Sequence, residues 1–159
     1  MKLYRKTADI HRATVGSLTI RQMKPDDLSR IMHLWLDCNV KTHNFIPVTY
    51  WRGHDDDVKQ SISEAEVYIC EKSGLIVGFI GLSGYYVAGL FVDPDYRSQG
   101  IGRLLLNHVK AIKSRLQLHV YCKNIRAVRF YQREGFVAIA EHFDPDTGEK
   151  EILMNFGKQ

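Results

Sequence analysis

The chain has 159 residues, of which 45% are hydrophobic and 25% charged, and its net charge is +4. This length predicts one domain, and the composition excludes disordered, collagen-like and coiled-coil classes. No apolar run approaches the ~18 residues of a membrane span, and the basic N-terminus lacks the apolar core of a secretory signal.

The cysteines indicate a reducing environment. Cys38, Cys70 and Cys122 are isolated, odd in number and form no C-x-x-C pair. This pattern argues against a disulfide framework and against a zinc site. We therefore expect no bound metal and a cytoplasmic location.

The first half of the chain predicts a helical region followed by paired strands. Residues 1–17 show no period and are expected to form an N-terminal extension to a single domain at 18–157. Pro25 suits the first turn of a helix. The expected elements are a strand at 18–23, a helix at 25–40, a weaker helix at 49–63, and strands at 66–71, 75–82 and 85–92.

The second half alternates helices with strands. Its expected elements are helices at 100–114 and 124–134 and strands at 116–122, 136–143 and 151–156. Gly135 is a common type of left-handed helix stop. The order predicts an α/β fold with antiparallel strands first and parallel helix crossovers later.

Positive charge is concentrated in one part of the chain. Residues 97–133 hold nine basic residues and no acidic one, whereas residues 18–96 and 134–159 each have a net charge of −4. Such a block indicates either an anionic ligand or two solvated basic helix faces.

The segment 90–106 is the most informative stretch. A strand leads into a turn, and the run 97–102, RSQGIG, then opens a helix. Unpaired N–H groups at a helix N-terminus hold phosphates, and Gly100 and Gly102 permit close approach and unusual φ values. The third glycine of a dinucleotide-binding fingerprint is missing, and no G-K-S/T follows.

Two motifs in this region resemble a known family. R-x-x-G-x-G after V-D-P, at 92–102, resembles motif A of the GNAT superfamily of acyl-CoA N-acyltransferases. N-x-x-A-x-x-F-Y-x-x-x-G-F, at 124–136, resembles its motif B, in the expected order. The resemblance spans about residues 18–156. Segments at 34–36, 44–46 and 50–51 resemble small bacterial single-domain members that acetylate lysine side chains or related amines.

The resemblance implies a fold and a cosubstrate. The GNAT fold is an α/β structure whose mixed, mostly antiparallel sheet is flanked by helices and contains a splayed parallel pair, here 88–92 and 116–122. The gap would admit the pantetheine arm of acetyl-CoA, and coenzyme A would be the product. The residues expected to bind acetyl-CoA are Leu90, Phe91, Val92, Arg97, Ser98, Gln99, Gly100, Ile101, Gly102, Arg103, Asn124, Arg126 and Tyr131.

The resemblance also implies catalytic roles. Asn124, Ala127 and Tyr131 share one face of the last predicted helix. Asn124 would bond the pantetheine amides, Tyr131 would protonate the leaving thiolate, and the Leu90 N–H would polarise the thioester carbonyl.

The sequence leaves several candidates for the general base. Strand 85–92 carries no carboxylate. Glu66, Glu71, a water chain, or His43 with a pKa near neutrality could serve. Asp93 and Asp95 are more typical of turn formers.

The acceptor would be a primary amine, and a protein or peptide lysine is the leading expectation. Candidate residues for its site are His43, Phe45, Tyr50, Trp51 and Tyr86. The acidic segments around the basic block favour a cationic acceptor.

Other functions are compatible with the same motifs. The acceptor could be a small amine such as a polyamine, an aminoglycoside or an amino acid, and a non-catalytic acyl-CoA sensor is a further alternative. Binding of nucleic acid fits less well, because the basic residues cluster around the coenzyme motif. A monomer or a homodimer is expected.

Overall fold

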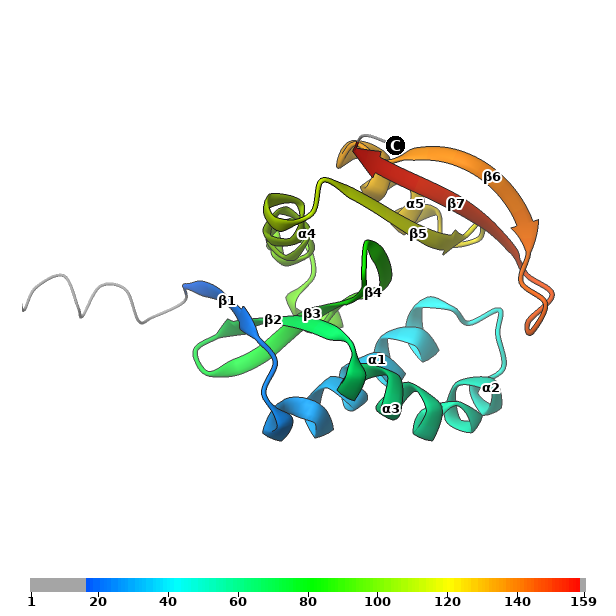
Figure 1. Cartoon of the computed structure of the whole chain (residues 1–159). Helices are drawn as coiled ribbons and strands as arrows, with labels where there is room; N and C mark the ends of the chain where they lie inside the picture. Colours follow the sequence, from blue (N-terminus) through cyan, green and yellow to red (C-terminus); the bar gives the residue numbers. More distant parts are fainter. Residues whose placement is uncertain (1–16, 158–159) are drawn as a thin grey trace, which may run out of the picture.

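The protein is built on a single seven-stranded sheet (Figure 1). The structure is a computed structural model that describes residues 17–157, so the predicted N-terminal extension lies outside it apart from Ser17. The strands follow the order β1-β2-β3-β4-β5-β7-β6. Their bounds are β1 Leu18–Gln22, β2 Glu66–Lys72, β3 Leu75–Ser83, β4 Tyr86–Val92, β5 Arg115–Tyr121, β6 Val137–Phe143 and β7 Lys150–Gly157.

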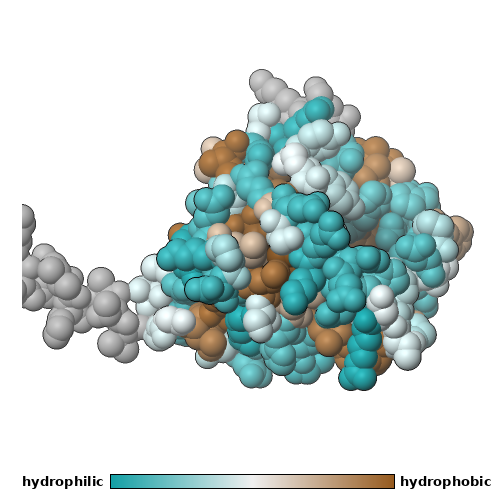
Figure 2. Space-filling model, turned by 60° about the horizontal axis from the view of Figure 1, so that its bottom comes forward, coloured by the Kyte–Doolittle hydropathy of each residue, from teal (hydrophilic) through white to brown (hydrophobic). Residues whose placement is uncertain are grey.

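Helices cover both faces of this sheet, α1–α3 on one side and α4 and α5 on the other (Figure 1). Their bounds are α1 Leu28–Thr42, α2 Val48–Gly53, α3 Asp55–Glu64, α4 Ile101–Ile112 and α5 Ile125–Arg133, with short 3-10 turns at Pro25–Asp27 and Pro94–Tyr96. Each layer has its own buried cluster, centred on Leu105 and Leu118 on one side and on Trp35 and Phe79 on the other. Hydrophilic side chains predominate on the face that Figure 2 shows, with apolar side chains in small patches among them.

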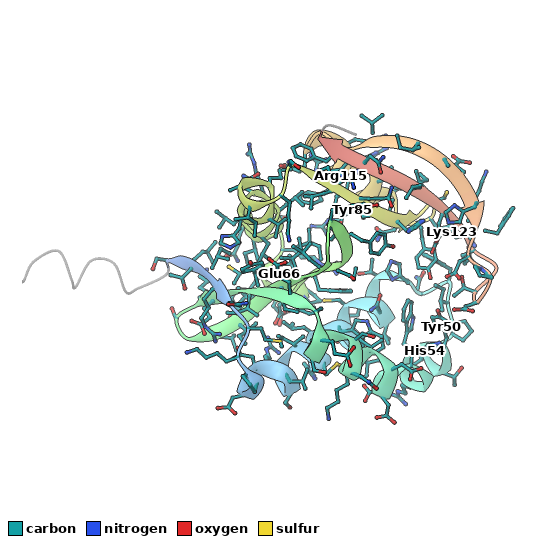
Figure 3. The ribbon with its side chains drawn as sticks, viewed as in Figure 1. Tyr50, His54, Glu66, Tyr85, Arg115 and Lys123 are labelled. Atoms are coloured by element: carbon teal, nitrogen blue, oxygen red, sulfur yellow. The ribbon has the colours of Figure 1, made fainter. Side chains whose placement is uncertain are left out.

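The sheet opens between β4 and β5. All other neighbouring strands pair antiparallel, whereas β4 and β5 are parallel and meet at one register position, Tyr86 opposite Gln117. The Gln117 N–H donates to the Tyr85 carbonyl oxygen at 3.1 Å. The Arg115 guanidinium lies 4.1 Å from the centre of the Tyr85 ring (Figure 3). This cation–π contact joins the starts of β4 and β5 at the closed end of the gap. The predicted α/β fold with a splayed parallel pair is confirmed.

Two predicted helices differ in detail from the structure. The helix expected at 49–63 is two helices, α2 and α3, because the chain turns at His54, whose Nδ1 bonds the Tyr50 carbonyl oxygen at 2.7 Å. Asp55–Asp57 then supply negative charge to the first turn of α3. The helix expected from residue 25 begins as a 3-10 turn, and α1 follows from Leu28.

The glycines were predicted with mixed success. Gly135 has φ +90° after α5 and ends that helix as expected. Gly102 lies inside α4 and does not have the positive φ that its motif position suggested. A Cβ there would meet Phe130 at an ordinary 3.5 Å, so its role is not conformational.

Within residues 17–157, no helix combines the length and the apolar character needed to cross a bilayer.

Candidate functional site

A cleft of about 480 Å³ opens where β4 and β5 separate. It is bounded by the C-terminal half of α1, the end of β4, the start of α4, and α5. Its lining residues are Cys38, Asn39, Thr42, His43, Leu90, Phe91, Val92, Arg97, Ser98, Gly100, Ile101, Gly102, Arg103, Asn124, Arg126, Ala127, Phe130, Tyr131, Arg133 and Glu134.

The turn before α4 presents a helix N-terminus to this cleft. Ser98 and Gly100 have φ values of +63° and +80°, and Gly100 is the N-cap residue of α4. A Cβ on Gly100 would have no atom within 4 Å, so open space lies above the turn. The first N–H groups of the helix face this space without intrahelical partners, which is the geometry that binds phosphate oxygens.

Three arginines surround the turn. Arg97 donates to the Thr42 hydroxyl at 2.9 Å, and Arg126 reaches the Ser98 hydroxyl at 3.4 Å. Arg103 is 3.7 Å from a Glu134 carboxylate oxygen. Positive charge therefore collects at one end of the cleft, where an anionic ligand would be attracted.

Gln99 is placed differently from its neighbours in the motif. Its Oε1 accepts a hydrogen bond from Lys72 Nζ at 2.8 Å, and it is not among the residues that line the cleft. Its side chain is therefore directed to Lys72 in this structure, while its backbone forms part of the turn.

One carbonyl group at the edge of β4 already accepts a hydrogen bond. The Cys38 thiol donates to the Val92 carbonyl oxygen at 3.3 Å. Burial raises the pKa of this thiol to about 11, so it carries its proton at neutral pH. A ligand that pairs with the Val92 carbonyl would share this acceptor with the thiol or replace it, because a carbonyl oxygen has two lone pairs.

Tyr131 lies on the wall of the cleft formed by α5. Its side chain is 8% exposed and packs against Phe130 and Phe136 with ring centres 5.2 and 5.4 Å apart. Burial raises the pKa of the phenol well above its usual range. The hydroxyl therefore keeps its proton at neutral pH, and burial also makes it a weaker acid than an exposed phenol.

A chain of hydrogen bonds joins α1 to α5 across the cleft. The Asn39 amide Nδ2 donates to the Trp35 carbonyl oxygen at 2.9 Å, and Asn39 Oδ1 lies 3.0 Å from His43 Nδ1. The Asn124 amide Nδ2 lies 3.2 Å from His43 Nε2. Because Asn39 Oδ1 can only accept, Nδ1 of His43 carries the hydrogen and Nε2 accepts from Asn124.

Asn124 is also the N-cap residue of α5, because its Oδ1 accepts from the Ala127 N–H at 3.2 Å. The expected partner of Asn124 was the pantetheine arm. In this structure one hydrogen of its amide faces His43, and its oxygen holds the start of the helix.

The expectation of a near-neutral His43 is wrong. Burial lowers its pKa to about 4, since a charged imidazole loses water there and no carboxylate among residues 17–157 compensates for that loss. His43 is therefore a neutral imidazole at pH 7.

The carboxylates expected as alternative bases are held elsewhere. Glu66 bonds the Tyr68 hydroxyl and Lys113, and Figure 3 shows it on β2, far from Tyr50 and Lys123. Glu71 is paired with Arg21. Neither lines the cleft.

The candidate acceptor residues fall in four places. His43 lines the cleft, while Phe45 and Tyr50 line a neighbouring pocket of about 390 Å³ with Asp146 and Thr147. Trp51 is buried against Trp35 with its rings 6.1 Å apart and lines neither pocket. The Tyr86 hydroxyl lies 2.6 Å from His119 Nδ1.

Tyr121 contacts one lining residue of each pocket and was not predicted from the sequence. Its ring lies edge-on to both His43 and Phe45, and its hydroxyl donates to Asp144 at 2.8 Å. The alternation of strand 116–122 places Tyr121 on the opposite face from Val120, a signal that could have found it. Asn39 and Thr42 were also missed, although they lie one helical turn and one residue before His43.

Comparison with known proteins gives consistent matches. A family model described as "Acetyltransferase (GNAT) domain" matches residues 63–138. The peptidyl-lysine N-acetyltransferase YiaC of Escherichia coli is 34% identical over 119 residues, which are 74% of this chain and 82% of YiaC. The peptidyl-lysine N-acetyltransferase YjaB of the same organism is 30% identical, over 87% of this chain and 95% of YjaB.

The fold comparison agrees with the sequence comparison. The solution structure of apo YjaB from Escherichia coli superimposes with a TM-score of 0.78 and 27% identity. The match covers 89% of this chain and 99% of that structure. The similarity therefore extends over most of the chain.

Proposed function

Because this chain belongs to the GNAT family of acetyltransferases, we propose that it transfers the acetyl group of acetyl-CoA to the side-chain amine of a lysine in a protein or peptide. The observation that carries the proposal is the cleft at the β4–β5 separation, which joins a phosphate-binding turn to a strand edge and a buried tyrosine. Two relatives named peptidyl-lysine N-acetyltransferase support the choice of acceptor.

Acetyl-CoA, the acetyl donor of this family, suits the charge and shape of the cleft. Its pyrophosphate would lie on the N–H groups at the start of α4, where Gly100 leaves space and Arg97 and Arg103 add positive charge. The pantetheine arm would run along Leu90–Val92 in place of a neighbouring strand. Gln99 would contribute its backbone alone, because its side chain is bonded to Lys72.

The proposed reaction is a direct attack. The neutral amine nitrogen forms a bond to the thioester carbonyl carbon, the C–S bond breaks, and the amine passes one proton to water. Tyr131 supplies a proton to the leaving sulfur and regains one from water, a role supported by its position on the cleft wall and by the proton that its hydroxyl holds at neutral pH. The Leu90 N–H would stabilise the developing oxyanion.

The acceptor would enter on the side of Phe45, Tyr50 and Tyr121. Asp144 and Asp146 lie at this entrance, in the turn between β6 and β7. The pKa of Tyr50 is raised by burial first and then by the charges of Asp144, Asp146 and Glu151. The local potential is therefore negative, which attracts a lysine ammonium.

The three free thiols support a cytoplasmic setting.

The test is an acetylation assay with acetyl-CoA and a matched panel of acceptors. The panel contains a lysine peptide, the same peptide with the lysine replaced by norleucine, free lysine, a polyamine and an aminoglycoside. Mass spectrometry locates the transferred group. We expect acetylation of the lysine side chain of the peptide. Turnover with a small amine and none with the peptide would contradict the lysine proposal, and acetyl-CoA binding without any turnover would indicate a sensor.

A further inference from the structure

Two histidines and a glutamate come together on the β5–β7–β6 part of the sheet. They are His119 of β5, His142 of β6 and Glu151 of β7, and each offers one ligand atom within 4.8 Å of the other two. His142 Nε2 is 3.2 Å from a Glu151 carboxylate oxygen, and the rings of His119 and His142 are 4.9 Å apart. The cluster is separate from the lining of the acetyl-CoA cleft.

Strand register explains why these three residues share a face. His119 is opposite Leu153, and His142 is opposite Glu151. Directly paired residues point to the same side of a sheet, and so do residues two apart on one strand. Leu153 and Glu151 are two apart, so all three polar side chains project from the same face.

We propose that His119, His142 and Glu151 bind a divalent transition-metal ion of the Zn²⁺ type. Two imidazole nitrogens and a carboxylate oxygen form a ligand set that Zn²⁺ accepts, and a fourth position would be left for water or another ligand. Solvent reaches the cluster, since the side chains of His142 and Glu151 are 44% and 18% exposed. An ion can therefore enter without unfolding of the sheet.

Tyr86 contacts the proposed site through His119. Its hydroxyl lies 2.6 Å from His119 Nδ1, which leaves Nε2 of that ring to the metal. A metal-bound histidine usually donates its other ring N–H to a fixed partner, and this bond orients the ring. Tyr86 is also the residue at which β4 and β5 last pair. The ion would therefore tie β5, β6 and β7 to the closed end of the acetyl-CoA gap.

The alternative is an ordinary His142–Glu151 ion pair beside an unrelated Tyr86–His119 hydrogen bond. A metal site requires all three side chains at once, whereas this alternative gives His119 no part in holding an ion. Single substitutions at the three positions can therefore separate the two readings.

The test is calorimetric titration of the chelator-treated full chain with Zn²⁺ alone. Variants His119→Ala, His142→Ala and Glu151→Gln are compared with His33→Ala, an exposed histidine on α1, and Glu141→Gln, a neighbouring acid that pairs with Lys150. We expect one equivalent in the wild type and in both controls. Each cluster variant loses a ligand atom, so its affinity should fall by more than the ~10–100-fold that loss of a ligand's outer hydrogen-bond partner costs. Tyr86→Phe should weaken binding by a smaller factor.

Titration with Co²⁺ provides a second readout, because its visible absorption reports the ligand set directly. Circular dichroism without metal shows whether each variant folds, and any variant that does not fold is replaced by His119→Gln or His142→Gln. Absence of Zn²⁺ binding by the wild type would overturn the proposal. Binding that persists in all three folded cluster variants would also overturn it and assign the ion to other residues.

Discussion

His43 Nε2 lies 3.2 Å from the Asn124 amide nitrogen, and this contact joins the end of α1 to the start of α5. The sheet is open between β4 and β5. Helix α1 packs on the strands before this opening, and α5 packs on β5 after it. Both residues line the cleft, so the contact links two of its walls. It also connects the N-cap of α5 to the buried Asn39, so helix capping and cleft geometry depend on the same side chain.

Replacement of Asn124 should separate its two roles. Asn124→Ala removes both the cap and the contact with His43, and loss of a cap costs about 1 kcal/mol of folding free energy. Asn124→Ser keeps an oxygen that can cap the helix but cannot reach His43. We expect Ser to recover most of the stability in denaturant unfolding, while both variants show a raised KM for acetyl-CoA. Equal stability of the two variants would contradict the capping role.

Replacement of Tyr131 by Phe should affect turnover more than folding. The ring packs between Phe130 and Phe136, and Phe preserves those contacts. Loss of a general acid typically lowers the rate ~10²–10⁴-fold. We expect kcat to fall within that range, with the melting temperature and the Kd for acetyl-CoA little changed. Near wild-type turnover would show that another group protonates the thiolate.

A negative charge at Gly100 should abolish binding of coenzyme A. Gly100 has φ +80°, and a Cβ there meets no atom within 4 Å. Asn and Asp tolerate this backbone conformation better than other residues with side chains, so Gly100→Asn is a matched neutral control for Gly100→Asp. We expect Asp to weaken binding far more than Asn in calorimetry. Similar affinities for the two variants would argue against phosphate binding at this turn.

Acid should destabilise the fold partly through His43. Its pKa falls from 6.5 to about 4 on folding because of burial, so the unfolded chain binds a proton that the folded chain does not. The contribution of His43 to the free energy of unfolding is therefore constant above pH 6.5. It declines as the pH falls from 6.5 towards 4. We expect His43→Gln to reduce the slope of unfolding free energy against pH in this window.

The control for His43 is His33→Gln on the exposed face of α1, which should leave that slope unchanged. Comparison of the two variants cancels the contribution of carboxylates that titrate nearby. A slope that is the same in both variants would show that His43 is protonated equally in the folded and unfolded chains.

Charge at the acceptor entrance should select cationic peptides. Asp146 lines the pocket next to Tyr50, so a lysine flanked by Lys should have a higher kcat/KM than one flanked by Ala or Glu. The preference should shrink at high salt, because screening weakens exposed charges. Asp146→Asn should reduce it, whereas Asp56→Asn, the same change on α3, should not. Equal kcat/KM for the three peptides would leave selection to the aromatic walls.

The sequence alone determined the elements and the helix-opening turn. Alternating and helical periods depend on neighbouring residues, so most strands and helices were predicted within a few residues of their observed ends. Gly135 and the turn at 97–100 were also readable, because a left-handed backbone and an uncapped helix start are local properties. The break at His54 was missed because it depends on a hydrogen bond back to Tyr50.

Tertiary structure alone decided which side chains meet. Trp51 and Tyr50 are adjacent in sequence, yet one packs in the core and the other lines a pocket. The pKa of His43 follows from burial beside Asn39 and Asn124, residues four and eighty-one positions away. His119, His142 and Glu151 share a face only through the pairing of β5, β6 and β7. Local patterns contain neither register nor burial, because both arise from contacts between residues distant in sequence.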